Sequence, residues 1–422
     1  MKNTMIFKKT AIAASIALLT ACGGSGTGTT ASTQSTSVGT ITGFGSIVFD
    51  DGNKYDTDAT NEMTSDGVPT DISGYKVGDK CVITGTVNGD GTGTATAVHC
   101  KDELEGFVSD VSGMTDNNGK TGTMVVMGQT VTITLDTVFE SDNIDDSYTS
   151  IDQVVAGDVI EVSGYSDGNG TVLASRVETK LASDADIEVK GLVSGYTDGA
   201  TSFTIGTLVV DITSLTGTMP PLSDGLYIEV KAETAPTTDV NGVQTLVATA
   251  IEIEDGGDMD VEGENIELNL TGLVSDMVPE GFTFNGSTFI DYEFVDIEDT
   301  FVITEGMKIT VEGYIDADGV FVPEEVVEEP ETENETYGYV TSVAEGTISI
   351  SMDNGDTVET FTVNNETRMI DELNHEQYFK LLDLAGMDNP FVEIGFYTTD
   401  SGEMIATEVE LEAAPAPSNT AM

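Results

Sequence analysis

A short glycine-marked strand pattern recurs along this chain and sets the size of the units into which it can fold. Each copy has a glycine, an apolar or β-branched residue, and small polar residues, a composition typical of β-strands. The copies start 67, 85, 81 and 66 residues apart, which indicates small repeated modules. They are Gly39-Thr40-Ile41-Thr42, Gly106-Phe107-Val108-Ser109, Gly191-Leu192-Val193-Ser194, Gly272-Leu273-Val274-Ser275 and Gly338-Tyr339-Val340-Thr341.

A second repeat, a hairpin, lies towards the end of each copy. Its first strand alternates apolar and polar residues, the period-2 pattern of a half-buried strand, and Asp/Gly-rich turns follow in most copies. The apolar positions of the first strand are Cys81 and Ile83, Ile160 and Val162, Ile228 and Val230, Ile309 and Val311, and Val392 and Ile394. The return strand carries Cys100, Val177, Ile251, Val326 and Val409, which we take as equivalent positions. All of these side chains are predicted to face a core.

The order of elements in each copy suggests a fold. Asp371 to Leu384 in the last copy has leucines on one helical face and no proline, which predicts a helix, whereas Asp145 to Val155 suits only a shorter turn or helix. Three strands, a helix or loop, and two strands is the order of the OB fold, a five-stranded barrel. We therefore predict an all-β chain, a tandem array of five small OB-like β-barrel modules with one short helix, most evident in the last module. A β-sandwich is the alternative, since strand order is not readable from one sequence.

These patterns divide the chain into segments. We predict a signal peptide at 1–21, a lipidated cysteine with a flexible tether at 22–38, and a disordered tail at 412–422. The β modules are expected at 39–102, 103–181, 186–254, 266–328 and 336–411, with acidic linkers at 255–265 and 329–335.

The first module carries a family resemblance. Gly39-Thr40-Ile41-Thr42-Gly43-Phe44-Gly45-Ser46-Ile47-Val48-Phe49, continuing to Tyr55-Asp56-Thr57, resembles the domain of unknown function 5666 family of exported bacterial proteins. The Gly-Phe-Gly-Ser signature is absent from the later copies. The resemblance implies a small β-barrel-like repeat and implies no activity.

The N-terminus predicts export and lipid anchoring. Lys2, Lys8 and Lys9 precede a short uncharged run that ends in Leu19-Thr20-Ala21-Cys22, which resembles the lipobox of bacterial lipoproteins. The resemblance implies cleavage before Cys22 and acylation of that cysteine, and several acyl chains together anchor a protein stably. Gly23 follows, and under enteric-type sorting this residue is compatible with the outer membrane. We expect a protein anchored to the cell envelope, facing the periplasm or the surface.

The charge balance limits the partners. The chain has 15 basic and 75 acidic residues, a net charge of −60, and removing the three signal lysines leaves 12 − 75 = −63. Such a field repels phosphate backbones, so we expect no nucleic-acid partner. The acidic surface favours solubility and also attracts cations.

Two cysteines remain after Cys22. Cys81 and Cys100 are equally far from the turn centre between Asp90 and Gly91, so they face each other on a regular hairpin. An exported location favours a structural disulfide between them, with two reduced core thiols as the alternative.

No constellation for catalysis is evident. Nucleophilic or acid–base catalysis needs groups brought together, and the two histidines, His99 and His375, lie in different modules. By alternation His99 points to the face opposite Cys100, towards solvent. We expect no cofactor and no enzyme activity, and zinc is disfavoured because no further ligand lies at a suitable spacing.

The acidic inter-module segments offer one cation hypothesis. The segment from Glu254 to Glu264 carries side chains that could gather calcium between modules, although solvated linkers explain them better. The candidate ligands are Asp255, Asp258, Asp260, Glu262 and Glu264. The leading hypothesis is a non-enzymatic binding or spacer array for a protein or glycan partner. The alternatives are a calcium-stiffened acidic adhesin and, more distantly, a carboxylate-based hydrolase.

Overall fold

The computed structural model shows an almost entirely β-stranded protein. It describes residues 33–414 apart from 45, 89–90, 142–149, 184, 216–218, 255–265, 287, 298–300, 317–319, 329–331, 345, 352–356, 365–366, 372, 374–379 and 400. In this part of the chain the helical elements are short 3-10 helices, at Ile72–Gly74, Asn117–Gly119, Ile151–Gln153 and Leu381–Gly386. The prediction of an all-β chain with small barrel-like units is confirmed.

The first segment forms a closed ring of strands. The ring runs β1-β2-β3-β7-β6 and back to β1, with a parallel β3–β7 pair and antiparallel pairs elsewhere. Its strands are β1 (Thr33–Gly43), β2 (Ile47–Phe49), β3 (Lys54–Asp56), β4 (Glu62–Ser65), β5 (Val68–Pro69), β6 (Lys80–Val87) and β7 (Thr92–Cys100). Because β1 begins at Thr33 and pairs with β6 from there, the predicted tether to residue 38 extends too far.

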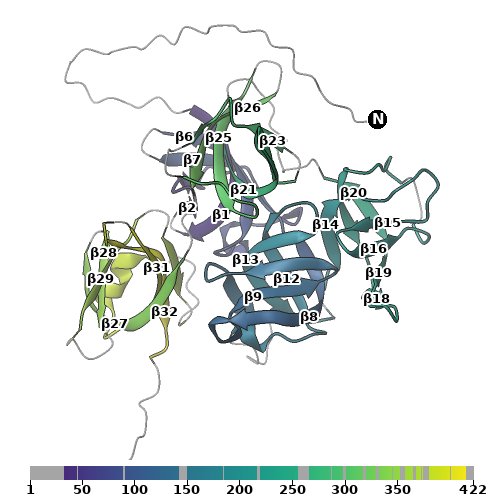
Figure 1. The fold of residues 1–422 in the computed structure, drawn as a ribbon. Helices are drawn as coiled ribbons and strands as arrows, with labels where there is room; N and C mark the ends of the chain where they lie inside the picture. The colour runs from purple at the N-terminus through teal and green to yellow at the C-terminus, as the bar shows by residue number, and fades with distance from the viewer. Residues whose placement is uncertain are drawn as a thin grey trace, which may run out of the picture. The chain divides into compact units, whose positions relative to one another are not determined.

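The second and fifth segments repeat this ring. In the second the order is β8-β9-β10-β13-β12 and back to β8, and Figure 1 shows its strands curving around one another. In the fifth the order is β27-β28-β29-β32-β31 and back to β27. The strands are β8 (Leu104–Asp116), β9 (Thr121–Val126), β10 (Gln129–Ile133), β11 (Val138–Ser141), β12 (Val159–Ser166), β13 (Thr171–Lys180), β27 (Asn334–Ala344), β28 (Thr347–Ser351), β29 (Glu359–Thr362), β30 (Arg368–Asp371), β31 (Phe391–Thr398) and β32 (Met404–Glu412).

The third segment closes a looser ring. Its return strand is broken into β19 and β20, and an isolated bridge pairs Ser194, just after the first strand, with Thr204 of the second strand. The strands are β14 (Glu188–Leu192), β15 (Ser202–Ile205), β16 (Leu208–Asp211), β17 (Tyr227–Lys231), β18 (Thr237–Thr238), β19 (Gln244–Val247) and β20 (Ala250–Ile253).

The fourth segment has the same strands in an incomplete ring. Among its described residues β23 pairs with β22 alone, whereas the corresponding strand of the first segment also pairs with the return strand. The strands are β21 (Glu267–Val278), β22 (Gly281–Phe284), β23 (Thr288–Asp291), β24 (Asp296–Ile297), β25 (Lys308–Ile315) and β26 (Phe321–Glu328).

The aligned hairpin residues lie in the cores, as predicted. All ten apolar positions of the first strands are at most 1% exposed, and on the return strands only Ile251 is more than 3% exposed. One assumed equivalence, that of Cys100, is wrong. Val177, Ile251, Val326 and Val409 each face the second apolar position of their hairpin, as Val98 faces Ile83, whereas Cys100 faces Cys81. Val177 therefore corresponds to Val98 and not to Cys100.

The recurring glycine marks a close approach of two strands. A Cβ added to Gly39 would lie 2.3 Å from Oδ1 of Asp50, which follows β2. In the fourth segment a Cβ on Gly272 would lie 2.0 Å from Oδ1 of Asn285. Both distances are shorter than real Cβ contacts, so a side chain at either glycine would displace the side chain of Asp50 or Asn285.

Sheets and cores run across the segment boundaries. Strand β1 pairs in parallel with β21 of the fourth segment, and β8 pairs with β14 of the third. The buried residues of the second and third segments form one hydrophobic cluster, while the first, fourth and fifth each centre on their own. The expected separate core in each module is thus wrong for the second and third. The count of five modules stays a prediction.

Two local predictions also need correction. Of the helix predicted from Asp371 to Leu384, the described part holds β30 and a 3-10 helix from Leu381, and Leu384 is its buried residue. The acidic linker predicted at 329–335 is shorter, because β27 starts at Asn334 and pairs with β31. Acidic residues here lie on the solvent side of strands. An acidic composition is the same in such a strand and in a linker, so it does not distinguish the two.

Candidate functional site: the charged joints

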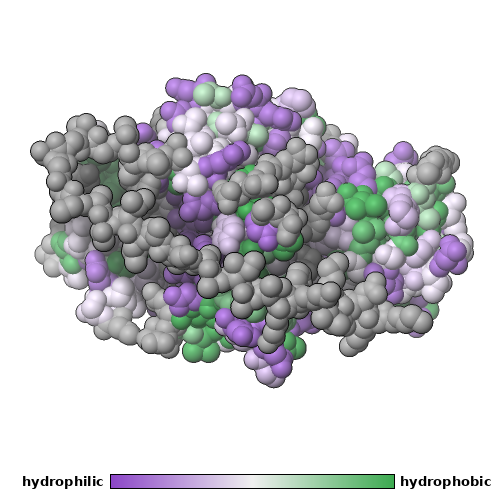
Figure 2. Space-filling model, turned by 90° about the horizontal axis from the view of Figure 1, so that it is seen from above, coloured by the Kyte–Doolittle hydropathy of each residue, from purple (hydrophilic) through white to green (hydrophobic). Residues whose placement is uncertain are grey.

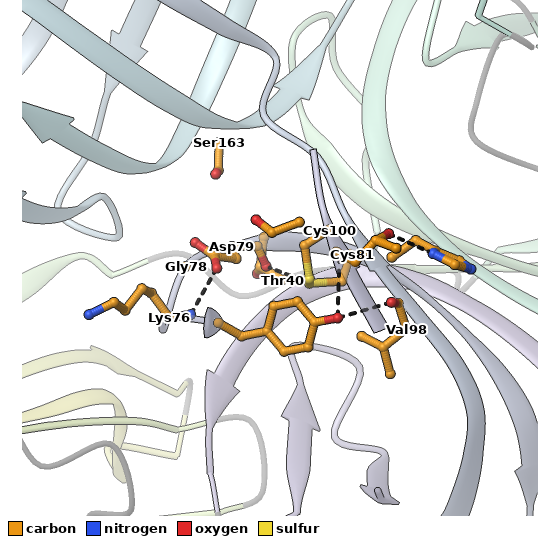
Figure 3. Close-up of a disulfide and its surroundings, with 12 residues drawn as sticks. Thr40, Lys76, Gly78, Asp79, Cys81, Val98, Cys100 and Ser163 are labelled. Carbon is orange, nitrogen blue, oxygen red and sulfur yellow. Dashed lines mark hydrogen bonds between the residues drawn. A yellow bond between two sulfur atoms is a disulfide. The ribbon is translucent and has the colours of Figure 1, made fainter. Parts of the chain in front are cut away.

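The disulfide predicted between Cys81 and Cys100 is confirmed. The two residues are directly opposed on β6 and β7, with Cα atoms 4.0 Å apart (Figure 3). Nearby, the Tyr75 hydroxyl donates to the carbonyl of Val98 at 3.0 Å, and both sulfurs lie in the core of the first segment. The disulfide therefore fastens the hairpin that this segment presents to the second.

The structure describes only one of the other predicted site residues, His99. His99 points away from the disulfide and is half-buried, with its Nδ1 2.8 Å from the Thr64 hydroxyl, so it has a partner rather than facing open solvent. Cys22, His375 and the five proposed calcium ligands of residues 255–264 lie outside the described residues.

Arginine usage points to a different site. The chain contains only two arginines, Arg176 and Arg368, and the side chains are 3% and 12% exposed. Each contacts carboxylates from more than one segment. Since a guanidinium stays charged and binds carboxylates in a fixed fork geometry, these positions are where the chain needs a permanent, directional cation.

Arg176 holds the first and second segments together. Its Nη1 lies 3.8 Å from Asp79 of the first segment and 3.6 Å from Glu161 of β12, and its Nη2 lies 2.5 Å from Glu178 and also contacts Glu140. Lys180 joins the network at 2.9 Å from Glu161. These carboxylates surround one buried guanidinium, which raises its pKa further above the ordinary value for arginine.

Backbone and lysine contacts extend this joint. The Ser175 hydroxyl donates to the carbonyl of Gly78 at 2.6 Å, and Lys80 Nζ lies 2.7 Å from Glu103, whose other oxygen accepts from Tyr227 of the third segment at 3.1 Å. A polar cavity of about 320 Å³ lies between the two segments. It is lined by Ser65, Asp66, Lys76, Asp79, Lys101, Asp102, Glu161, Ser163, Arg176, Glu178 and Lys180, among others.

A row of glutamates crosses the sheet beside Arg176. The strand register places one glutamate opposite the next on β11, β13, β12, β8 and β14, and Lys231 of β17 ends the row. The row is Glu140, Glu178, Glu161, Glu105 and Glu188. Because like charges directly opposite each other repel, this arrangement requires either cations or protons.

The pKa values of the glutamates in this row shift in different directions. Arg176 lowers the pKa of Glu140, despite burial. Glu105 is 8% exposed and further along the row, and burial, aided by Glu161, raises its pKa to about 8. Burial raises the pKa of Glu188 to about 7, although Lys190 opposes this. At neutral pH Glu140 is therefore ionised beside Arg176, and Glu105 holds a proton.

Arg368 forms a second joint, between the fifth and second segments. Its Nη2 contacts Glu408 at 2.5 Å and Asp136 of the second segment at 3.3 Å. Backbone N–H of Thr332 donates to Asp136 at 3.1 Å. Despite burial, Arg368 and Thr332 lower the pKa of Asp136, so this carboxylate stays ionised in the joint.

Among the residues that the structure describes, one group of carboxylates has the spacing of a metal site. Oxygens of Glu229, Glu252 and Glu254 lie within 4.8 Å of one another. Lysines already occupy the position of a cation there, because Lys231 lies 2.6 Å from Glu229 and Lys101 lies 2.8 Å from Glu254. The group therefore fits the pattern of the other joints better than that of a calcium site.

Sequence reasoning missed these residues for a definable reason. Glu161 lies between Ile160 and Val162, so alternation assigns it to the solvent side of its strand. The side is correct, but another segment covers it. The scarcity of arginine was the available signal, since only two positions of so acidic a chain carry one.

Sequence comparison finds a known family in two places. The family model described as Domain of unknown function (DUF5666) matches residues 105–178 and 337–410. Two stretches of the chain are therefore similar to this family. The two matched stretches lie in the second and fifth segments, two of the closed rings, and not in the first segment, on which the sequence resemblance rested. The family description assigns no activity.

Other comparisons add little. No curated protein sequence matches the chain. A multidomain protein with nucleic acid binding domains from Streptococcus pneumoniae is similar at 9% identity and a TM-score of 0.15, over 54% of this chain and 73% of that one. Drosophila Unr CSD456 is similar at 15% identity and a TM-score of 0.13, over 53% and 96%. Likeness this weak carries no argument about fold or function.

Hydrophilic residues cover much of the face drawn in Figure 2, with small hydrophobic patches between them. No helix among the residues described is both long and apolar enough to span a bilayer.

Proposed function

We propose that this protein is a lipid-anchored, non-enzymatic scaffold of the bacterial cell envelope, in which five OB-like modules are held in fixed positions to present binding surfaces to a protein or glycan partner. The anchor is Cys22, and the location is the outer membrane, facing the periplasm or the surface. No nucleic acid and no catalytic cofactor takes part.

The use of cations at the joints carries this proposal. A chain with 75 acidic residues repels itself, so separate modules on flexible linkers would move apart. Both arginines are instead buried between segments, and Lys80, Lys101 and Lys308 also contact carboxylates of other segments or of the linkers between segments. Breaking a buried pair is costly, so these contacts favour a fixed arrangement.

Strand pairing between segments supports the same conclusion. The β1–β21 pair extends over four residues from Ser35 to Val38. Leu104 and Glu105 of β8 pair with two residues of β14. Hydrogen bonds of this kind fix relative orientation, which side-chain contacts alone do not. A scaffold with fixed spacing is the function that such an arrangement serves.

Small-angle X-ray scattering of the soluble chain from residue 23 onward tests the proposal. The wild type should give one compact particle whose radius of gyration is unchanged by added salt. The double variant Arg176→Met and Arg368→Met should expand, while Lys76→Met, which removes an exposed pair, should not. A wild-type particle that is extended and variable in shape would refute the fixed arrangement.

Anchoring needs a separate test. Expression of the full chain with labelled palmitate should give a labelled protein in the membrane fraction, and Cys22→Ser should be unlabelled and soluble. Label on the Cys22→Ser variant, or none on the wild type, would refute the lipid anchor.

A further inference from the structure

The fourth segment leaves one seam of its ring open. In the first segment Lys54, Tyr55 and Asp56 pair in parallel with Thr92, Gly93 and Thr94, which closes the ring. The strand register aligns these residues with Phe289–Asp291 and with Val320–Val322, since Ile47 faces Tyr55 as Phe282 faces Ile290. All six residues of the fourth segment are described, and none pairs across the seam.

A proline on the return strand fits an open seam. The position that faces the hairpin bulge is Ala95 in the first segment, Ala174 in the second and Ala406 in the fifth, whereas the fourth has Pro323. Proline has no N–H to donate and is confined to edge strands and bulges. Beside Pro323 on the return-strand side Val320 is 41% exposed, and on the other side of the seam Phe289 is 51% exposed.

Some backbone hydrogen-bonding groups of β23 point to the open side, where a further strand could pair with them. The N–H of Tyr292 donates to the carbonyl of Glu280, and in an antiparallel pair hydrogen-bonded positions alternate, so Ile290 and Thr288 also bond to β22. The backbone groups of Phe289 and the N–H of Asp291 therefore point away from β22, to the open side. An edge of this kind is a template for strand addition.

The surroundings of the seam set the chemistry of an occupant. Residues 266–328 contain fifteen acidic residues and one basic residue, Lys308, which already pairs with Asp50 of the first segment at 3.7 Å. Apolar side chains lie exposed beside the edge, with Phe294 65% exposed. Exposed carboxylates around the two sides of the seam are those of Glu280, Glu293, Asp296, Glu324 and Glu325.

We propose that the open edge of β23 binds an extended, basic peptide segment of an exported partner protein, which adds as a strand beside Phe289 and Asp291. This inference rests on the proposed function, for which it names the binding site and the class of partner. Main-chain hydrogen bonds hold the strand, apolar side chains of the partner cover Phe289 and Phe294, and its basic side chains meet the surrounding carboxylates. A second copy of this chain is disfavoured, because it brings a further −60 of charge.

Labelled synthetic peptides test the proposal on the soluble chain from residue 23 onward. The probe is a ten-residue peptide of alternating lysine and valine. The control alternates lysine and proline, which keeps the charge and prevents strand addition. The lysine–valine peptide should bind saturably and protect the amides of Phe289 and Asp291, which face the open edge, from hydrogen exchange. Equal binding of both peptides, or protection elsewhere only, would overturn the proposal.

Two variants locate the site. Phe289→Pro removes an N–H that faces the open edge and not β22, so the fold should be kept and binding of the lysine–valine peptide should weaken about tenfold or more. The pair Glu293→Gln and Glu324→Gln should weaken binding in low salt more than the matched pair Asp152→Asn and Glu233→Gln, which are exposed in other segments. Unchanged affinity in Phe289→Pro, with its circular dichroism unchanged, would overturn the proposal.

Failure here is distinguishable from failure of the proposed function. Scattering reports on the fixed arrangement without any ligand, so a compact wild type with no peptide binding overturns the β23 site alone. Binding of a neutral oligosaccharide in place of the peptide would likewise overturn this inference and keep the scaffold.

Discussion

The guanidinium of Arg176, on the return strand of the second segment, lies 3.8 Å from the carboxylate of Asp79 in the first segment, and both side chains are almost completely buried. Burial raises the pKa of Asp79 to about 7, even though Arg176 lowers it. The pair is therefore an electrostatic contact between two repeats, surrounded by three further carboxylates that depend on the same cation.

Arg176→Met should strongly destabilise the joint. The substitution leaves Asp79, Glu161 and Glu178 buried without their shared cation, at a cost of about 3–5 kcal/mol. Denaturant unfolding of the soluble chain measures the loss. The control, Lys76→Met, breaks a pair whose side chains are 50% and 37% exposed, and it should cost about 0–1 kcal/mol. Similar losses in both variants would contradict a special role for Arg176.

The disulfide should stabilise the first segment. Its two cysteines are 19 residues apart, and closing a loop of this length contributes about 3 kcal/mol through the unfolded chain. Cys81→Ile with Cys100→Thr takes the residue types of the corresponding positions, Ile160 and Thr179, and should lower the unfolding free energy by that amount. Reductant should destabilise the wild type and leave the variant unchanged. Equal sensitivity of the two proteins would show that the disulfide contributes nothing.

Folding stability should fall as pH rises between about 4.5 and 8, in part through Glu105. Burial, aided by Glu161, raises the folded-state pKa of Glu105 to about 8 from its ordinary value of 4.5. Between pH 4.5 and 8 the unfolded chain has lost this proton and the folded chain keeps it. Rising pH favours the state that binds fewer protons, so it favours unfolding. Glu105→Gln removes this contribution, and its stability, measured across the same window, should decline less than that of the wild type. A parallel decline would contradict the assignment.

Gly85→Ala should destabilise the first segment. A Cβ at this bulge would lie 2.1 Å from the backbone carbonyl of Thr94, and backbone atoms have little room to move. The expected cost is about 1–3 kcal/mol, as for other overpacked sites. Gly43→Ala is the matched control, because its added Cβ meets nothing within 4 Å. Thermal unfolding of both variants compares them directly, and an equally stable Gly85→Ala would contradict the close approach.

The buried hairpin positions were predictable because alternation reflects a physical constraint on a half-buried strand. Ile83, Val162 and Val311 are fully buried as predicted. The pairing partner was not predictable in the same way. Val177 and Thr179 lie on the same face of β13, so a slip of two residues preserves the apolar pattern and leaves no trace in the sequence.

The joints escaped prediction because they depend on which surfaces meet. Glu105 and Glu161 lie on the outer side of their strands, where sequence reasoning places soluble charge. Pairing of β8 with β14, and contact with the first segment, convert that side into an interior. Asp79 and Arg176 are 97 residues apart, and no local pattern links them. Local periodicity determines the strands, whereas docking between segments determines the charged joints.

A distance measurement between two spin labels by double electron–electron resonance tests the fixed arrangement most directly. Labels at Asp58→Cys in the first segment and Val358→Cys in the fifth occupy exposed positions, and neither contacts a joint. The account predicts one narrow distance distribution, which broadens when Arg176 and Arg368 are both changed to methionine. A distribution that is already broad in the otherwise wild-type chain would contradict it.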